Sequence, residues 1–357
     1  MSKTNIKRIL AIDLMRAFAV FMMVQGHTVH SLLSVSSINT SSYFYQIWLF
    51  FRAFTAPLFI FSAGLVFTYI LFQKEIDFKN NPRIVKGIYR GFSLYLIGYL
   101  LRFPTIQIFS LDEVTHYQWL TFFSVDALHL IGIGLLLIVL ISIVSSKLKI
   151  NPIYIFVSLV IIIFAGSPFL RLLNWEHNVN IFVASYFTIK YGSIFPIFPY
   201  LEFVFFGAIF GVLITQKHEI ITKKSYLISY LVAGAVLLFL AYLTFSYRDY
   251  SDSLLRFGAL FTFLSIFSFI GARITKLPKI VASFARNSLW IYIIHLIILY
   301  GSPTSIGITQ ILDVTLSPEL TILSAIFMVS LMTLISLGID KFRTQKFNFF
   351  RKNLGLE

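Results

Sequence analysis

The sequence contains no cysteine, so disulfide bonds, thiolate metal sites and a cysteine nucleophile are all excluded. Charge is also scarce, because only 12% of the 357 residues are charged, whereas 58% are hydrophobic and 40 are Phe. With a mean hydropathy of +0.84, the chain has too little polar surface to cover a soluble globule of this length. The composition therefore predicts an integral membrane protein.

Long apolar stretches run through the whole chain, and each is about long enough to cross a bilayer, or nearly so. The loops between them are too short to form a separate soluble domain, so we expect one domain over residues 1–357. The fold class predicted is an all-α polytopic membrane protein of about ten transmembrane helices. The stretches lie near residues 9–33, 45–72, 85–103, 126–146, 151–167, 194–215, 225–245, 254–272, 287–302 and 319–339.

The 29 Lys and Arg residues outnumber the 15 Asp and Glu residues, giving a net charge of +14. When the loops are assigned alternately to the two sides of a membrane, most basic residues fall on the side of the N-terminus. The positive-inside rule then predicts that both termini are cytoplasmic, in a multi-pass protein of the inner (plasma) membrane. The excess of basic residues thus indicates the orientation of the chain in the membrane. We therefore expect the lipid bilayer as a partner, and no nucleic acid. The opposite side carries only Arg102, Arg171, Lys190, Arg248 and Arg256.

The first stretch, AIDLMRAFAVFMMVQGHTVHSLL, carries four ionisable residues, Asp13, Arg16, His27 and His30. On a helix, Arg16 and His27 return to within about 20° of one face, and His27 lies roughly 16 Å further along the axis. Ionisable groups inside a span normally face a polar cavity, which favours a functional stripe. Alternatively, Asp13 and Arg16 pair with each other while His27 reaches the outer boundary.

Other spans supply candidate partners for this stripe. Arg52, in the second span, is predicted near the outer level, close to His27, although it could equally be an arginine at the membrane interface. Asp126 begins the fourth span and either orients His129 or caps the helix. His295 lies inside the ninth span, where a lone histidine needs a polar partner.

Several segments together resemble a known family. RILAIDLMRAFAVFMMVQGH is similar to the first-helix signature of the transmembrane acyltransferases, which has an arginine, an isoleucine-aspartate pair, a second arginine and then a histidine. FRAFTAPLFIFSAG, VDALHLIGIGLLL, FPYLEFVFFGAIFG and NSLWIYIIH resemble later motifs of that group in the same order. The closest resemblance is to bacterial proteins related to the catalytic domain of heparan-alpha-glucosaminide N-acetyltransferase, with the acyltransferase 3 group more distant. Ala17 departs from the glycine usual after Arg16.

The resemblance implies an enzyme that takes an acyl group, usually acetyl, from cytoplasmic acyl-CoA. The acceptor would be the hydroxyl or amine of a sugar-like molecule or glycan at the outer side. His27 would act as general base, or else as a nucleophile that forms an acyl-imidazole, and we favour the base. His295 and Asp126 complete the catalytic set, and no metal is expected. The residues expected to bind the donor are Arg16, Asp13, Arg52, Arg90 and Arg286.

A proton-coupled secondary transporter is the alternative function, because such proteins use intramembrane Asp, Arg and His groups as a relay. Two features count against it. The two halves of the chain have no matched pair of Gly/Pro-interrupted spans, and loop 73–84 lacks the glycine and arginine cluster of the major facilitator group. A homo-oligomer is also possible, since Gly207 and Gly211 form a small-residue face on the sixth span.

Overall fold

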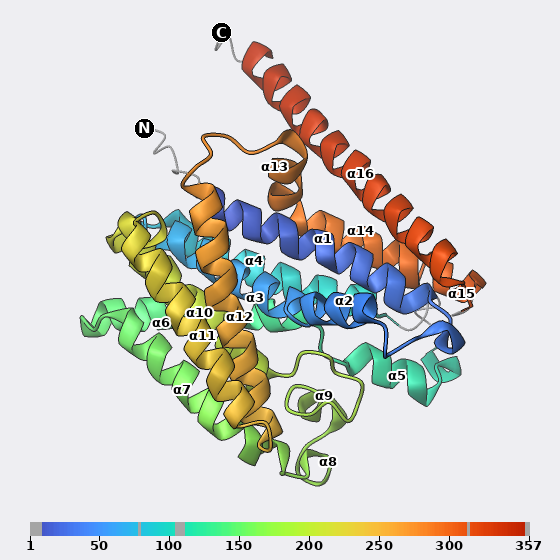
Figure 1. Ribbon diagram of the computed structural model, residues 1–357. Helices are drawn as coiled ribbons and strands as arrows, with labels where there is room; N and C mark the ends of the chain where they lie inside the picture. Colours follow the sequence, from blue (N-terminus) through green and yellow to red (C-terminus); the bar gives the residue numbers. More distant parts are fainter. Residues whose placement is uncertain (1–8, 78–79, 104–110, 313–314, 354–357) are drawn as a thin grey trace. The chain divides into compact units, whose positions relative to one another are not determined.

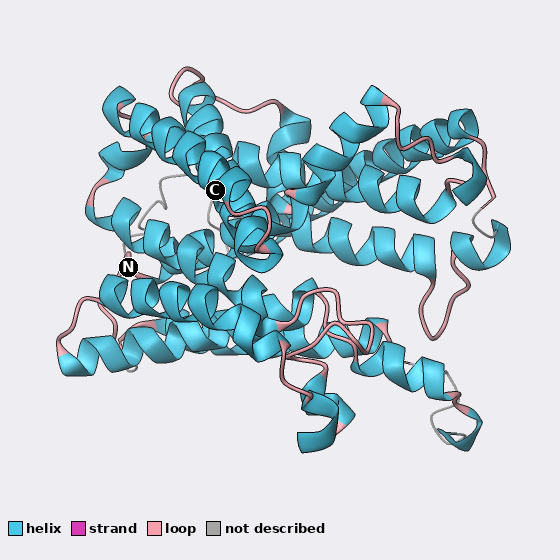
Figure 2. Cartoon of the chain, turned by 60° about the horizontal axis from the view of Figure 1, so that its bottom comes forward, coloured by secondary structure: helices cyan, strands magenta, loops and turns pink. Residues whose placement is uncertain are grey.

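The computed structural model describes residues 9–77, 80–103, 111–312 and 315–353 (Figure 1). Within those ranges every extended regular element is a helix, as Figure 2 shows, so the prediction of an all-α protein is confirmed. The chain divides into two compact units, which are described separately. Unit 1 comprises Met1–Ile12 and Ala56–Arg273, and unit 2 comprises Asp13–Thr55 and Ile274–Glu357. The two ends of the chain, residues 1–8 and 354–357, lie outside the described residues, so their cytoplasmic placement stays a prediction.

Unit 1 contains most of the long helices. Its closest helix pairs are α11 with α12, α4 with α6, and α10 with α7. Short helices lie between α4 and α6 and between α7 and α10. The elements are α3 (Thr55–Leu71), α4 (Pro82–Leu101), α5 (His116–Phe123), α6 (Ala127–Leu148), α7 (Pro152–Arg171), α8 (Trp175–Asn178), α9 (Ile181–Ala184), α10 (Ile197–Gln216), α11 (Lys224–Leu243) and α12 (Arg248–Gly271).

Unit 2 contains the first helix together with the C-terminal part of the chain. In it α13 and α14 pack against α16. The helix α1 begins at Leu10, and its length from Asp13 onward belongs to this unit. The elements are α1 (Leu10–Leu32), α2 (Tyr43–Ala53), α13 (Lys279–Arg286), α14 (Ser288–Tyr300), α15 (Ile308–Leu312) and α16 (Pro318–Asn353).

Among the described residues, eight helices are long and apolar enough to cross a membrane, or nine if the bent pair α13 and α14 counts as one span. The protein is therefore a multi-pass membrane protein, consistent with the prediction of about ten transmembrane helices. The predicted stretch that is not among these spans is 85–103, which corresponds to α4, Pro82–Leu101. Its first half carries Arg83, Lys86 and Arg90, and these charges lower its hydropathy.

Two predicted spans are interrupted. The stretch predicted as 45–72 is divided at Phe54, where α2 ends and α3 begins. Pro57 explains the division, because its nitrogen has no hydrogen to donate to the carbonyl of Ala53 and its ring crowds that carbonyl. The stretch predicted as 287–302 contains only the 13 residues of α14, which meets α13 at 80° around Asn287.

The small-residue face of α10 is used inside unit 1. A Cβ atom added at Gly207 would lie 2.1 Å from the carbonyl oxygen of Phe61, and one added at Gly211 would lie 2.7 Å from that of Leu65. Both carbonyls belong to α3, so these glycines allow the backbones of α3 and α10 to approach closely. This face therefore packs within the chain, and it gives no support to the expected homo-oligomer.

In unit 2, backbone hydrogen bonds fix the ends of α1 and α14. Leu316 donates to the carbonyl of Leu32 at 3.0 Å, and Ser34 donates to that of Leu316 at 3.0 Å, which ties the end of α1 to the segment before α16. The helix α14 ends at Gly301, whose positive φ of 84° suits a residue without a side chain. Figure 1 shows α1 in blue and α14 in orange lying side by side.

Candidate functional site

Three residues of α1 meet three residues of α14, in the same order along both helices. The Arg16 guanidinium donates from Nη2 to Ser288 Oγ at 2.6 Å. Further along, the rings of His27 and His295 meet edge to face, with centroids 5.4 Å apart. Finally, Ser31 Oγ donates to the Tyr300 hydroxyl at 2.6 Å. The two helices therefore run parallel, although Arg16 and Ser288 are 272 residues apart in sequence.

The His27 end of this pair is a cluster of polar side chains. His27 is half-buried, and its Nδ1 lies 3.4 Å from the Tyr300 hydroxyl. His295 is fully buried, and its Nδ1 lies 2.7 Å from the carbonyl oxygen of Ile291. Because a carbonyl only accepts, Nδ1 of His295 carries the hydrogen, and its Nε2 is an acceptor when the ring is neutral. That Nε2 is buried and has no hydrogen-bond partner among the described residues.

Arg52 lies beside this cluster, as the sequence predicted. A Cβ atom added at Gly26 would lie 3.6 Å from Arg52 Cγ, so the arginine stem crosses α1 one residue before His27. The Arg52 guanidinium sits over the Trp48 ring, 5.3 Å from its centroid. Trp48 in turn donates from Nε1 to Gln25 Oε1 at 2.8 Å. The cation is therefore held near His27 by α2.

The Arg16 end of the pair lies at the break between α13 and α14. Ser288 is the first residue of α14, and Asn287 at the break donates to the carbonyl of Ser336 at 3.1 Å and to Asp340 Oδ1 at 3.0 Å, both on α16. Arg286 forms a two-pronged ion pair with Asp340, with both N···O distances 2.9 Å. The predicted donor-binding residue Arg286 thus already has a carboxylate partner.

The face of α1 that carries Arg16 and His27 is apolar between these two residues. Val20 and Met23 lie on the same face of the helix as the two polar residues, and both are buried. Asp13 is also buried, at 9% exposure, one turn before Arg16. The polar stripe predicted on α1 therefore has two polar ends and an apolar middle.

Asp126 and Arg90 belong to unit 1, whereas the α1–α14 pair belongs to unit 2. Asp126 caps α6 by accepting from the backbone N–H of Leu128 at 2.8 Å, and its Oδ1 also lies 3.0 Å from His129 Nδ1. Both alternatives, a cap and a partner of His129, therefore hold at once. Arg102 Nε lies 3.6 Å from the other carboxylate oxygen. Arg90 is exposed on α4.

A chain of tyrosine hydroxyls lies next to His129 in unit 1 and was not predicted from the sequence. The hydroxyls of Tyr99 and Tyr186 are 2.6 Å apart, and Tyr186 donates to Tyr95 at 3.0 Å. The rings of Tyr99 and His129 meet with centroids 4.3 Å apart. Burial, followed by the hydrogen bonds to Tyr95 and Tyr99, raises the pKa of Tyr186 above its ordinary value of 10, so this hydroxyl stays protonated at neutral pH.

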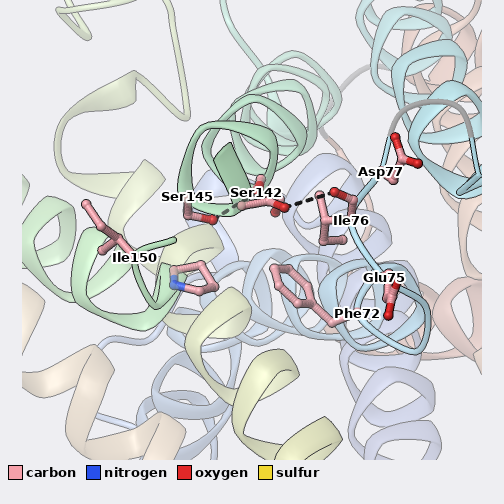
Figure 3. A pocket seen from close by; sticks show the side chains of 9 residues that line it. Phe72, Glu75, Ile76, Asp77, Ser142, Ser145 and Ile150 are labelled. Atoms are coloured by element: carbon pink, nitrogen blue, oxygen red, sulfur yellow. Dashed lines mark hydrogen bonds between the residues drawn. The ribbon is translucent and has the colours of Figure 1, made fainter. Parts of the chain in front are cut away.

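Unit 1 also has a cavity of about 450 Å³ at the end of α3, beside α6 (Figure 3). Its polar lining includes the carboxylates Glu75 and Asp77. Ser146 beside it donates to the carbonyl of Ile76 at 3.0 Å. Two carboxylates repel phosphate groups, so this cavity does not suit the anionic part of a CoA thioester. None of the predicted site residues lines it.

Comparison with known proteins places the chain in a family. The family described as heparan-alpha-glucosaminide N-acetyltransferase, catalytic, matches residues 8–247. This range contains Arg16, His27, Arg52 and Asp126, whereas His295 lies beyond it. A search of curated proteins gave no match. Since the family match covers well over half of the chain, the protein belongs to the heparan-alpha-glucosaminide N-acetyltransferase catalytic-domain family, a family of membrane transferases of the acetyltransferase type.

Proposed function

We propose that the protein moves an acyl group, acetyl by family, from acyl-CoA to a hydroxyl or amine of a sugar-like acceptor. The donor would be bound from the cytoplasmic side of the inner (plasma) membrane, and the acceptor at the outer side. The observation that supports this most is the parallel pair of α1 and α14. Arg16 lies at one end of this pair, and His27 and His295 face each other toward the other end. Donor binding and proton transfer would then take place at the two ends of one helix pair.

Arg16 would bind the phosphates of the donor, since a guanidinium offers several N–H groups in a geometry that matches phosphate. The first turn of α14 lies beside it, and the positive end of a helix dipole also favours an anion. Asp13, one turn before Arg16, would hold that side chain in place. Val20 and Met23 between the two ends are buried, so the less polar arm that carries the thioester would reach His27 only when these side chains move aside.

His27 would act as the general base. It would take the proton from the acceptor hydroxyl or amine while that atom attacks the thioester carbon, and would then return the proton to the departing CoA sulfur. Arg52 on α2, whose side chain lies beside Gly26, the residue before His27, would stabilise the negative charge that develops on the carbonyl oxygen. His295 Nε2, an acceptor without a partner among the described residues, would hold an N–H or O–H of the acceptor.

The remaining predicted site residues are Arg286, Arg90 and Asp126. Arg286 is paired with Asp340, so only its other N–H groups would reach a phosphate. Arg90 and Asp126 lie in unit 1, and their proposed roles in binding the donor and in catalysis rest on the family resemblance. Asp126 would act through His129, because its carboxylate already accepts hydrogen bonds from the first turn of α6.

The purified protein should release free CoA from acetyl-CoA slowly even without an acceptor, because water can take the acceptor's place. A thiol-specific dye measures this directly, since the chain contains no cysteine and contributes no background signal. Protein-dependent thiol release that saturates with acetyl-CoA is the expected result. A protein that neither binds acetyl-CoA nor releases thiol contradicts the proposal.

The break between α13 and α14 favours the transporter alternative, because secondary transporters often bind substrate at interrupted helices. Vesicles containing the protein distinguish the two functions. A transporter moves solute across the membrane when a proton gradient is imposed, and it releases no thiol. The proposed acyltransferase releases thiol without any gradient.

A further inference from the structure

Two hydroxyl side chains connect to His27, and neither was singled out from the sequence. Ser31 Oγ donates to the Tyr300 hydroxyl at 2.6 Å, and that hydroxyl lies 3.4 Å from His27 Nδ1. Ser31 follows His27 by four residues, so both side chains lie on one face of α1. Ser31 is buried at 6% exposure, whereas the Tyr300 side chain is partly exposed. The three polar groups form a continuous chain across the two helices.

The backbone holds both hydroxyls in place. Tyr300 is the last residue of α14, and a Cβ atom added at Gly301 would lie 2.6 Å from the carbonyl oxygen of Ser305. Thr309 Oγ1 also donates to the carbonyl of Leu299 at 2.9 Å, which fixes the last turn. On the other side, the bridge between Leu33 and Leu316 lies two residues after Ser31. The backbone on both sides therefore fixes the position of the Tyr300 hydroxyl beside Ser31.

We propose that Tyr300 is a positioning residue for His27, and that Ser31 holds Tyr300 in the orientation this requires. The phenol oxygen accepts the hydrogen on His27 Nδ1, which leaves Nε2 as the nitrogen that receives a proton. This inference rests on the proposed function, because it assigns the partner of the same base. The distance of 3.4 Å is long for a hydrogen bond, and such contacts often tighten when substrate binds.

The proton and bond changes balance with Tyr300 in this role. His27 Nε2 takes the proton from the acceptor as the new acyl–oxygen or acyl–nitrogen bond forms and the carbon–sulfur bond breaks. The ring is then positively charged, and a hydrogen bond from a charged donor to the Tyr300 oxygen is stronger than a neutral one. The proton passes from Nε2 to the CoA sulfur, and both hydroxyls end unchanged. Tyr300 thus stabilises the charged ring in the transition state more than the neutral ring before it.

The variant Tyr300→Phe tests this role, because it keeps the ring and removes only the hydroxyl. Thiol release from saturating acetyl-CoA should fall about tenfold, as expected when one hydrogen bond to a charged group is lost. The KM for acetyl-CoA should stay unchanged, since Arg16 binds the donor at the other end of the helix pair. Ser31→Ala should give a smaller decrease. Adding Ser31→Ala to Tyr300→Phe should have no further effect, because Ser31 acts through Tyr300.

Tyr43→Phe is the matched control, since it removes a hydroxyl from an exposed tyrosine of the same unit and should leave thiol release unchanged. Binding of a CoA thioether, which cannot transfer an acyl group, checks that each variant is folded. An unchanged kcat in folded Tyr300→Phe overturns the inference while the proposed function stands. A multiplicative effect of Ser31→Ala in the Tyr300→Phe background also overturns it. No thiol release by the wild-type protein overturns both.

Discussion

Replacing His27 by alanine should lower thiol release from acetyl-CoA by at least about 100-fold, because general base catalysis contributes that much or more. The variant should still bind a CoA thioether almost as well as the wild type does. The reason is that His27 lies about 16 Å along α1 from Arg16, the residue assigned to the donor phosphates. The measurement is kcat for thiol release, together with the Kd of the thioether.

His30→Ala is the matched control for this variant, since it removes a histidine from the last turn of the same helix at an exposed position. It should keep nearly the full rate. If His27→Ala retains wild-type turnover, the assignment of the base is wrong. Wild-type protein quenched during turnover addresses the second route, because an acyl group found on His27 identifies this residue as a nucleophile.

Replacing Arg16 by alanine should raise the KM for acetyl-CoA about tenfold or more and change kcat much less. A hydrogen bond to a charged group contributes roughly 1.5–3 kcal/mol, and this variant removes such bonds from the donor but none from the acceptor. The KM for an acceptor should therefore remain nearly constant. The measurement is a full kinetic profile with each substrate varied in turn.

Two controls separate donor binding from a purely structural role of Arg16. Ser288→Ala removes the hydroxyl that Arg16 contacts and keeps the cation, so it should have a smaller effect on KM. Arg343→Ala removes a positive charge from an exposed position of α16 in the same unit and should have no effect. Equal increases in KM for both substrates in Arg16→Ala would show that the arginine only supports the fold.

The sequence predicted the helices that coincide with one uninterrupted apolar stretch. The stretch predicted as 9–33 is α1, Leu10–Leu32, and the stretch predicted as 225–245 is α11, Lys224–Leu243. Hydropathy could not predict the breaks, because they arise from local backbone chemistry and from distant partners. Pro57 interrupts one span, and the contacts of Asn287 with Ser336 and Asp340 on α16 accompany the other break.

The sequence predicted several residues of the candidate site, but it did not predict which helices pair to bring them together. The spacing of Arg16 and His27 and the position of Arg52 followed from helix geometry. The pairing of α1 with α14 joins residues more than 260 positions apart, so no periodicity could reveal it. Tyr300 was missed because a tyrosine near the end of a span is also typical of the membrane interface. The ion pair between Arg286 and Asp340 was missed because α13 and α16 are brought together only by the fold.

The central claim is that the face of α1 between Arg16 and His27 carries the acyl donor. Met23 lies midway on that face, and Met23→Cys would give the chain its only thiol, since the natural sequence has none. The rate at which a small maleimide modifies this thiol can be measured with and without a CoA thioether, which has no thiol of its own. Because position 23 is buried, the account predicts that the thiol reacts slowly, as the side chains around it move, and that the thioether slows the reaction further. A thiol that never reacts, or one that reacts at the same rate with the thioether present, would contradict it.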